Sequence, residues 1–237
     1  MTTRSKICID LNNLGVQLLE KGKYAHAAIV FRTALDRLIG KLPHDQCASF
    51  EPLAKRRRMG EAPTNSYETS QARSIQEENA FVYCHAFRIM PWSPTDANAP
   101  CQESFARDAA VIMYNLAMVK HLYYLASSEL PENSEPLSKA LYLYRMVHAI
   151  VVLDENKSLK EDPYFRLVMM ATCNNLAQIR FSLGQFEEAS ASMTGLATLL
   201  LVPPNAQSRV KLVSKEDMAG FHMNLLLLVT PTLASAA

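Results

Sequence analysis

Three asparagine residues of this chain occupy the same place in a repeated local sequence. Asn13, Asn115 and Asn175 each stand directly before a leucine and then a small residue, Gly or Ala. A carboxamide can donate and accept a hydrogen bond at once, which matches the N–H and C=O groups of one extended peptide unit. We therefore predict that these three side chains form a ladder that holds the backbone of a bound peptide. The alternative is that each asparagine hydrogen-bonds only to its own helix or to water.

A compact basic run, Lys55-Arg56-Arg57-Arg58, lies in a polar stretch that contains prolines. Such a run in a loop is suited to docking a nuclear-import receptor or another acidic partner. The alternative is a solvated charge cluster that no partner binds. Direct nucleic-acid binding is not favoured, because four charges without an aromatic platform give only weak, salt-sensitive attachment.

The residue types that most often carry catalysis show no productive spacing. The histidines never form an H-E-x-x-H motif or another metal-ligand spacing, and the sequence has no glycine-rich phosphate loop. Cys84 and His85 are neighbours on an expected strand, where successive side chains point to opposite faces, so they are unsuited to act as a nucleophile and its base. We expect no catalytic residues, no metal, no cofactor and no small-molecule substrate. An enzyme of unknown type is the most distant alternative.

The elements that must position the asparagines follow from helical periodicity. In the first unit, apolar and small residues recur at helical spacing in two short stretches, and Gly22 stands between them at the place of a left-handed C-terminal cap. The residues of the two stripes are Leu11, Leu14, Gly15 and Leu18, then Ala27, Phe31 and Ala34. Because Gly15 and Ala27 are small, the two helices can approach closely, and the unit is predicted to be a helical hairpin. Residues 167–202 repeat the pattern, with Gly184 at the turn.

The spacing L-x-x-L-G-x-x-L…Y-x-x-A-x-x-x-F-x-x-A resembles the tetratricopeptide repeat (TPR), a helical hairpin of about 34 residues that stacks into a solenoid. The N-N-L-[GA] openings are similar to those of kinesin-light-chain-type repeats. This resemblance implies a right-handed array of three TPR-like units, at about 8–39, 107–153 and 167–202, with the asparagine ladder on its concave surface. It also implies a non-catalytic adaptor or regulatory scaffold that binds a peptide or a partner helix on that surface.

Two segments interrupt the array. The middle unit carries a polar insertion, residues 127–138, at its hairpin tip, where a longer loop adds little closure entropy. Residues 41–106 fit no repeat and are expected to form a long inserted loop. Within this loop, residues 81–89 are rich in β-branched and aromatic residues, so they predict one short β-strand or half of a β-hairpin.

A final helix at about 215–229 is expected to cap the last unit. Ser214 with Asp217 three residues later is a helix-capping pattern, and one face of the segment is apolar. The alternative is a C-terminal membrane anchor, because residues 219–237 carry no charge. Pro231 and several polar residues interrupt the roughly 20 apolar residues that a spanning helix requires, so the capping helix is favoured.

Composition and charge limit the class of protein. The chain of 237 residues is 49% hydrophobic and 20% charged with a net charge of +1, so no global field favours nucleic acid or an anionic membrane. An odd number of cysteines without a C-x-x-C pair fits a reducing compartment, and the N-terminus lacks the apolar run of a secretory signal. We predict a single all-α domain over residues 1–237, cytoplasmic or nuclear, that works through protein–protein interaction. The alternative is a nuclear regulatory factor positioned by the basic run Lys55–Arg58.

Overall fold

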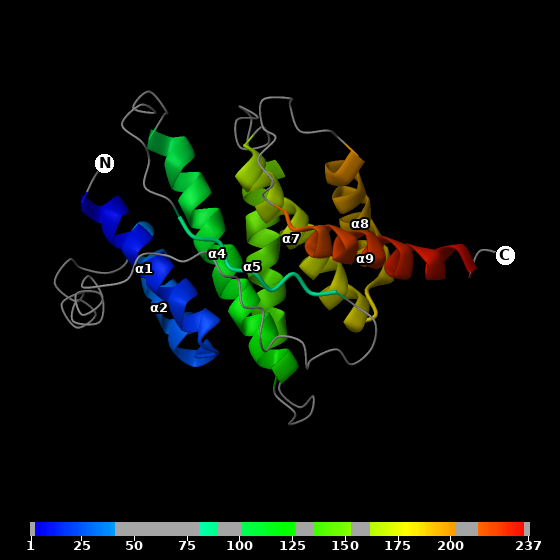
Figure 1. Ribbon diagram of the computed structural model, residues 1–237, viewed down its shortest axis with the longest axis horizontal. Helices are drawn as coiled ribbons and strands as arrows, with labels where there is room; N and C mark the ends of the chain where they lie inside the picture. The colour runs from blue at the N-terminus through cyan, green and yellow to red at the C-terminus, as the bar shows by residue number, and fades with distance from the viewer. Residues whose placement is uncertain are drawn as a thin grey trace.

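The computed structural model describes residues 3–40, 81–89, 101–126, 135–152, 162–201 and 213–234. Within these ranges the chain forms seven α-helices and no β-strand (Figure 1). The helices are α1 (Thr3–Glu20), α2 (Tyr24–Leu38), α4 (Cys101–Ala126), α5 (Glu135–Val152), α7 (Pro163–Ser182), α8 (Phe186–Leu201) and α9 (Lys215–Ala234). For the described part of the chain, the prediction of an all-α protein is confirmed.

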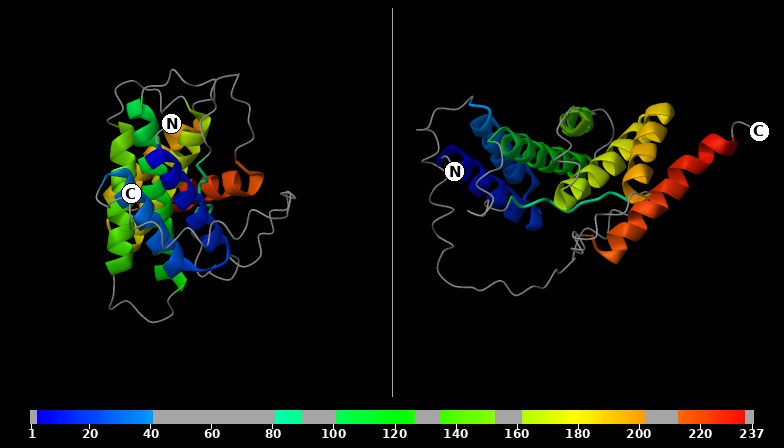
Figure 2. Two further views of the ribbon diagram at one scale, coloured as in Figure 1. Left: turned by 90° about the vertical axis from the view of Figure 1, so that its left-hand side faces the viewer. Right: turned by 90° about the horizontal axis from the view of Figure 1, so that it is seen from above.

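The helices pack in chain order as three hairpins followed by a final helix. Helix α1 contacts α2, α4 contacts α5, and α7 contacts α8, while the second helix of each pair contacts the helix that follows it. The first helices also contact one another, α1 with α4 and α4 with α7, and α7 contacts α9. As a result, α1, α4, α7 and α9 form one contiguous layer of the molecule (Figures 1 and 2).

Two of the hairpins turn on a glycine in the left-handed region of backbone space. Gly22 has a φ of 67° and Gly184 has a φ of 72°, a conformation that glycine adopts without steric cost. In each turn the residue after the glycine donates its N–H back to a carbonyl of the helix that is ending, over 2.9 Å from Lys23 and 2.8 Å from Gln185. These bonds satisfy carbonyls that the helix end would otherwise leave unpaired. The predicted left-handed cap at Gly22 is confirmed.

The first hairpin is held by a close contact between Gly15 of α1 and Phe31 of α2. A Cβ atom at Gly15 would lie 2.6 Å from the Phe31 ring, which is well inside van der Waals contact. Phe31 is fully buried, and so is Ala27, the small residue expected to face Gly15. The close approach that the sequence indicates for this hairpin is therefore confirmed at Gly15.

The segment Phe81–Ile89 is not a β-strand. No strand lies in the described ranges, so the prediction of a short strand or half-hairpin there is wrong. The segment instead runs as an elongated stretch across the layer of first helices (Figure 1). Its composition indicated an extended backbone, but the backbone groups are satisfied by helix side chains instead of a neighbouring strand. The loop expected over 41–106 also ends earlier, because α4 already begins at Cys101.

The last helix, α9, starts where the capping pattern placed it. The Ser214 hydroxyl oxygen accepts a hydrogen bond from the N–H of Asp217 over 2.9 Å. The helix ends at Ala234 instead of near residue 229, and it continues through Pro231. A proline removes one helical hydrogen bond, but Pro231 stands only three residues from the end of α9, so little of the helix is affected. Across the described ranges, no helix has both the length and the apolar character needed to cross a membrane.

One hydrophobic core runs through the described helices. The largest fully buried side chains come from all three hairpins and from α9, and they include Phe31, Tyr114, Tyr144, Phe165 and Phe221. Three side chains of the elongated stretch belong to the same core: Tyr83, Phe87 and Ile89 are 3%, 5% and 6% exposed. One face of the stretch thus belongs to the core, whereas His85 and Arg88 are exposed.

Candidate functional site

The elongated stretch Phe81–Ile89, here called the internal segment, lies across the layer of first helices. Seen from above, it follows one side of the row of helices, from α9 at one end to α1 at the other (Figure 2). Each helix of the layer contributes one asparagine that hydrogen-bonds to both the N–H and the C=O of one residue of the segment. These four residues, called the amide ladder below, are Asn13 of α1, Asn115 of α4, Asn175 of α7 and Asn224 of α9.

Each ladder asparagine makes a two-point contact with a single residue of the internal segment. Its side-chain oxygen accepts that residue's N–H, and its side-chain nitrogen donates to the same residue's C=O. The pairs are Asn13 with Ile89 (3.0 and 2.9 Å), Asn115 with Phe87 (2.8 and 2.8 Å), Asn175 with Tyr83 (3.0 and 3.0 Å) and Asn224 with Phe81 (2.9 and 2.6 Å). All contacted residues have odd numbers, as expected for an extended chain, whose alternate peptide groups face one edge. The ladder therefore recognises an extended backbone and not a particular sequence.

A second pair of asparagines, Asn12 and Asn174, links neighbouring members of the ladder. Asn12 accepts from Asn115 over 2.9 Å, and Asn174 accepts from Asn224 over 2.7 Å. Each also donates to a carbonyl of the internal segment, over 3.0 Å in both cases. Five of these six asparagines are fully buried: Asn12, Asn115, Asn174, Asn175 and Asn224. Because buried amides are costly when unpaired, the network and the internal segment depend on each other.

Three tyrosine hydroxyls complete the polar contacts around the internal segment. Tyr114 and Tyr164 donate to backbone carbonyls of the segment over 3.2 and 2.6 Å, and Tyr144 accepts from Asn175 over 3.0 Å. Burial raises the pKa of all three phenols above their usual value. The hydroxyls therefore keep their protons, and can donate, throughout the neutral pH range.

The side chains of the internal segment form an aromatic cluster with α9. Tyr83 is stacked with both Phe87 and Phe221, at centroid distances of 5.9 and 5.4 Å and with interplanar angles of 17°. Phe81 meets Phe221 edge-on at 5.6 Å. Gly220 leaves room for this ring, because a Cβ there would lie 2.5 Å from Phe81. Burial of each large side chain favours the bound segment by about 1.5–3 kcal/mol, so side chains contribute as well as backbone.

Two carboxylates bind the cationic side chains of the internal segment. Nη2 of Arg88 lies 2.8 Å from both carboxylate oxygens of Glu20 in α1. Nε2 of His85 lies 3.2 Å from Oδ1 of Asp217 in α9. The hydrogen bond with Asp217 raises the pKa of His85 above its usual value, although burial partly opposes it. The protonated imidazolium is thus the favoured partner of this carboxylate.

The structure places the three predicted peptide-binding residues, Asn13, Asn115 and Asn175, on one layer. Each of them hydrogen-bonds to a segment of the same chain, and not only to its own helix. Sequence reasoning missed the fourth member, Asn224, because α9 does not belong to a repeated hairpin. A signal for it was present, since Asn224-Leu225 repeats the Asn-Leu pair of the other three. The bridging pair was visible as the doubled asparagine of the N-N-L openings.

Metal-ligand clusters and the thiol of Cys84 can be assessed in the described part of the chain. There, no group of three or more His, Cys, Asp or Glu side chains could hold a metal ion. Burial raises the pKa of Cys84, which keeps its thiol protonated and poorly nucleophilic at neutral pH. The other predicted site, the basic run of Lys55, Arg56, Arg57 and Arg58, lies outside the described residues.

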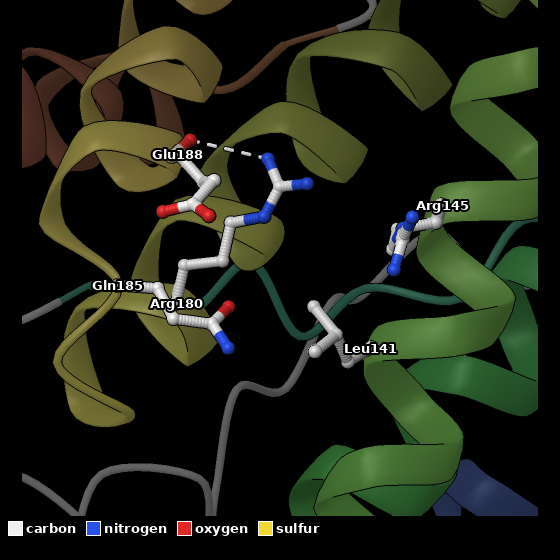
Figure 3. A pocket seen from close by; sticks show the side chains of 5 residues that line it. All are labelled: Leu141, Arg145, Arg180, Gln185 and Glu188. Carbon is white, nitrogen blue, oxygen red and sulfur yellow. Dashed lines mark hydrogen bonds between the residues drawn. The ribbon is translucent and has the colours of Figure 1, made fainter.

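A small surface pocket of about 180 Å³ is lined by residues of α5, of α7 and of the start of α8 (Figure 3). The lining residues are Leu141, Arg145, Arg180, Gln185 and Glu188. Nη1 of Arg180 donates to the backbone C=O of Glu188 over 3.1 Å, which ties α7 to the first turn of α8. Small-molecule sites typically measure about 300–1,000 Å³, so this pocket gives no ground for a substrate site.

Comparison with known proteins identifies no relative of this chain. No family model matches it, and neither a curated protein nor a solved structure does. The class of the protein therefore has to be inferred from its own geometry: stacked helical hairpins with an amide ladder that holds an extended segment.

Proposed function

We propose that this chain is a TPR-like, non-catalytic adaptor or regulatory scaffold that binds an extended peptide on its concave surface. That surface is the layer of α1, α4, α7 and α9, called the ladder surface below, and here the internal segment occupies it. The observation that carries the proposal is the amide ladder. The four helices of the ladder surface each offer one carboxamide, and each carboxamide pairs with the N–H and C=O of one residue of an extended chain.

The arrangement of the helices supports the TPR-like part of the proposal. Three hairpins follow one another in chain order, and each packs on the next. Two of them turn on a left-handed glycine, Gly22 and Gly184, at equivalent places of the repeat. Helix α9 covers the last hairpin, as the terminal helix of a solenoid must if the end of the core is to be shielded from water.

The energetics favour a segment that can be exchanged. The eight ladder hydrogen bonds contribute about 0.5–1.5 kcal/mol each, or roughly 4–12 kcal/mol together. Burial of four large apolar side chains adds about 6–12 kcal/mol. Ordering nine backbone residues costs about 9–18 kcal/mol. Gain and cost are thus of similar size, which is the condition under which a competing peptide can replace the internal segment.

A partner peptide must compete with a segment that is attached to the same chain. Residues 41–80 and 90–100 connect the internal segment to α2 and α4. A ligand that belongs to the same chain is present at a high effective concentration. A partner peptide of equal intrinsic affinity therefore has to reach similar concentrations or make additional contacts elsewhere. Competition of this kind would suit a regulated adaptor.

The proposal can be tested by separating the internal segment from its tethers. Recognition sequences for a site-specific protease are inserted within 41–80 and within 90–100, and the folded, purified protein is cleaved at both. A fluorescent synthetic peptide with the sequence of residues 81–89, carrying Cys84→Ser against oxidation, is then added. We expect the labelled peptide to replace the released segment, with a rise in fluorescence anisotropy that uncleaved protein does not show.

A matched control removes the one ladder residue whose side chain is partly exposed, so the fold is kept. The cleaved Asn13→Ala variant should bind the labelled peptide at least roughly fivefold more weakly, since two ladder hydrogen bonds are lost. If cleavage unfolds the protein, added peptide should restore the helical circular dichroism signal. Cleaved protein that stays helical without binding the peptide, or unfolded protein that the peptide does not restore, overturns the proposal.

A further inference from the structure

The ladder surface carries two carboxylates that the backbone contacts do not require. Glu20 is the last residue of α1 and Asp217 lies in the first turn of α9, so they come from the first and the last helix of the ladder surface. Each is paired with a cationic side chain of that segment, Glu20 with Arg88 and Asp217 with His85. Because the amide ladder recognises only backbone, side-chain contacts of this kind are what can discriminate between peptides.

Asp217 is the stronger of the two discriminating groups. Its side chain is only 12% exposed, whereas that of Glu20 is 55% exposed. A largely buried carboxylate is costly unless a cation or hydrogen-bond donor satisfies it, and a second carboxylate facing it would be repelled. An exposed ion pair such as that of Glu20 with Arg88 contributes little because water screens it. Discrimination should therefore centre on position 85 of the bound segment.

The apolar positions of the segment add a size requirement. Tyr83 and Phe87 are held by ring contacts with Phe221, Tyr114 and Tyr164, at centroid distances between 5.0 and 5.4 Å. Position 81 accepts an aromatic ring because Gly220 of α9, which the ring contacts, has no side chain to obstruct it. At position 89 the isoleucine side chain is buried. These contacts favour aromatic side chains at positions 81, 83 and 87 and an aliphatic one at position 89.

We propose that the ladder surface selects partner segments that repeat this pattern: aromatic residues at the positions of Phe81, Tyr83 and Phe87, an aliphatic residue at that of Ile89, and a cation at that of His85. The partner is thus a protein with an extended, aromatic and basic segment. Asp217 selects the cation, and Glu20 adds a weaker preference for a second cation at the position of Arg88. Acidic segments are rejected. This inference rests on the proposed function, since it requires the ladder surface to accept a peptide from another chain.

The experiment uses the doubly cleaved protein and synthetic nonapeptides based on residues 81–89, all with Cys84→Ser. At pH 6 the peptides compared are the parent, His85→Lys, His85→Gln and His85→Glu, measured by competition against the labelled parent. We expect the parent and His85→Lys to bind best, His85→Gln to be weaker, and His85→Glu to be at least roughly tenfold weaker than His85→Lys. A Phe87→Ala peptide should also lose at least about tenfold in affinity, because the buried ring is removed.

The matched protein variant is Asp217→Asn, which keeps the size of the side chain and removes its charge. With this variant the difference between His85→Lys and His85→Glu peptides should collapse to within about twofold, while Glu20→Gln should leave it almost intact. Equal binding of all four peptides to the cleaved native protein overturns the proposed selectivity at position 85 but not the proposed binding of peptides by the ladder surface. A difference that persists unchanged in Asp217→Asn overturns the role of this carboxylate. Failure of every peptide to bind removes the proposed function, and this inference with it.

Discussion

Replacing Asn175 by alanine should destabilise the whole fold and not only loosen the internal segment. Asn175 is fully buried and takes part in four short hydrogen bonds, two with Tyr83, one with Tyr144 and one from Asn174. Its removal leaves the N–H of Tyr83 and an N–H of Asn174 without their partner in the core, whereas the C=O of Tyr83 keeps the Tyr114 hydroxyl. At about 1–3 kcal/mol for each of these two unsatisfied buried groups, the loss is about 2–6 kcal/mol.

Urea titration followed by circular dichroism at 222 nm would measure this loss, supported by thermal melting. For a domain of this size each kcal/mol lowers Tm by about 2–4 °C, so the expected shift is about −4 to −24 °C. The matched variant is Asn13→Ala, whose side chain is partly exposed and contacts the segment at Ile89. Water can replace the lost partner there, so its cost should stay near 1 kcal/mol. The reasoning fails if Asn175→Ala is as stable as the native protein, or no less stable than Asn13→Ala.

Three further predictions follow from other parts of the chain. Asp217 raises the pKa of His85 in the folded state, so their contact stabilises the fold fully below the unfolded pKa of about 6.5, and this stabilisation is lost as pH rises through the folded-state pKa. The urea midpoints at pH 6 and pH 8.5 should therefore differ less in Asp217→Asn than in native protein. Gly15→Ala should lower the free energy of unfolding by about 1–3 kcal/mol despite the better helix propensity of alanine, since its Cβ would lie 2.6 Å from the buried Phe31 ring. In thermal melts, the control Gly195→Ala should be neutral or stabilising, because its Cβ would lie 3.4 Å from the nearest neighbouring atom. If an import receptor binds the basic run, replacing Lys55–Arg58 with alanine should move a tagged protein out of the nucleus without changing its Tm, and a native protein found only in the cytoplasm would refute that role.

The sequence allowed correct prediction of features that depend on residues close to one another along the chain. The first hairpin, its turn at Gly22 and its close contact at Gly15 all follow from residue spacing within about 20 positions. The cap at Ser214 is equally local. Such features could be predicted because helical periodicity and turn chemistry act over short distances.

The features that the sequence did not disclose depend on long-range pairing. The aromatic and β-branched composition of residues 81–89 indicated an extended chain, but nothing local says whether its backbone partners are another strand or side chains of distant helices. Likewise, the carboxamides of Asn115 and Asn175 were suited to holding a peptide, yet their spacing does not specify which peptide. Only the assembled layer shows that the occupant comes from the same chain.

The connection between Phe81 and Asn224 also sets an order of events during synthesis. These two residues are 143 positions apart, whereas the hairpins are joined by contacts between neighbours in sequence. Hairpin contacts can therefore form as each pair of helices leaves the ribosome, but the last ladder contact must wait for α9. At about 5–20 residues per second, that wait is roughly 7–30 s. During this interval the internal segment of the nascent chain lacks its last helical partner, which has not yet been synthesised. A chain that stops before α9 would never cover this aromatic segment completely.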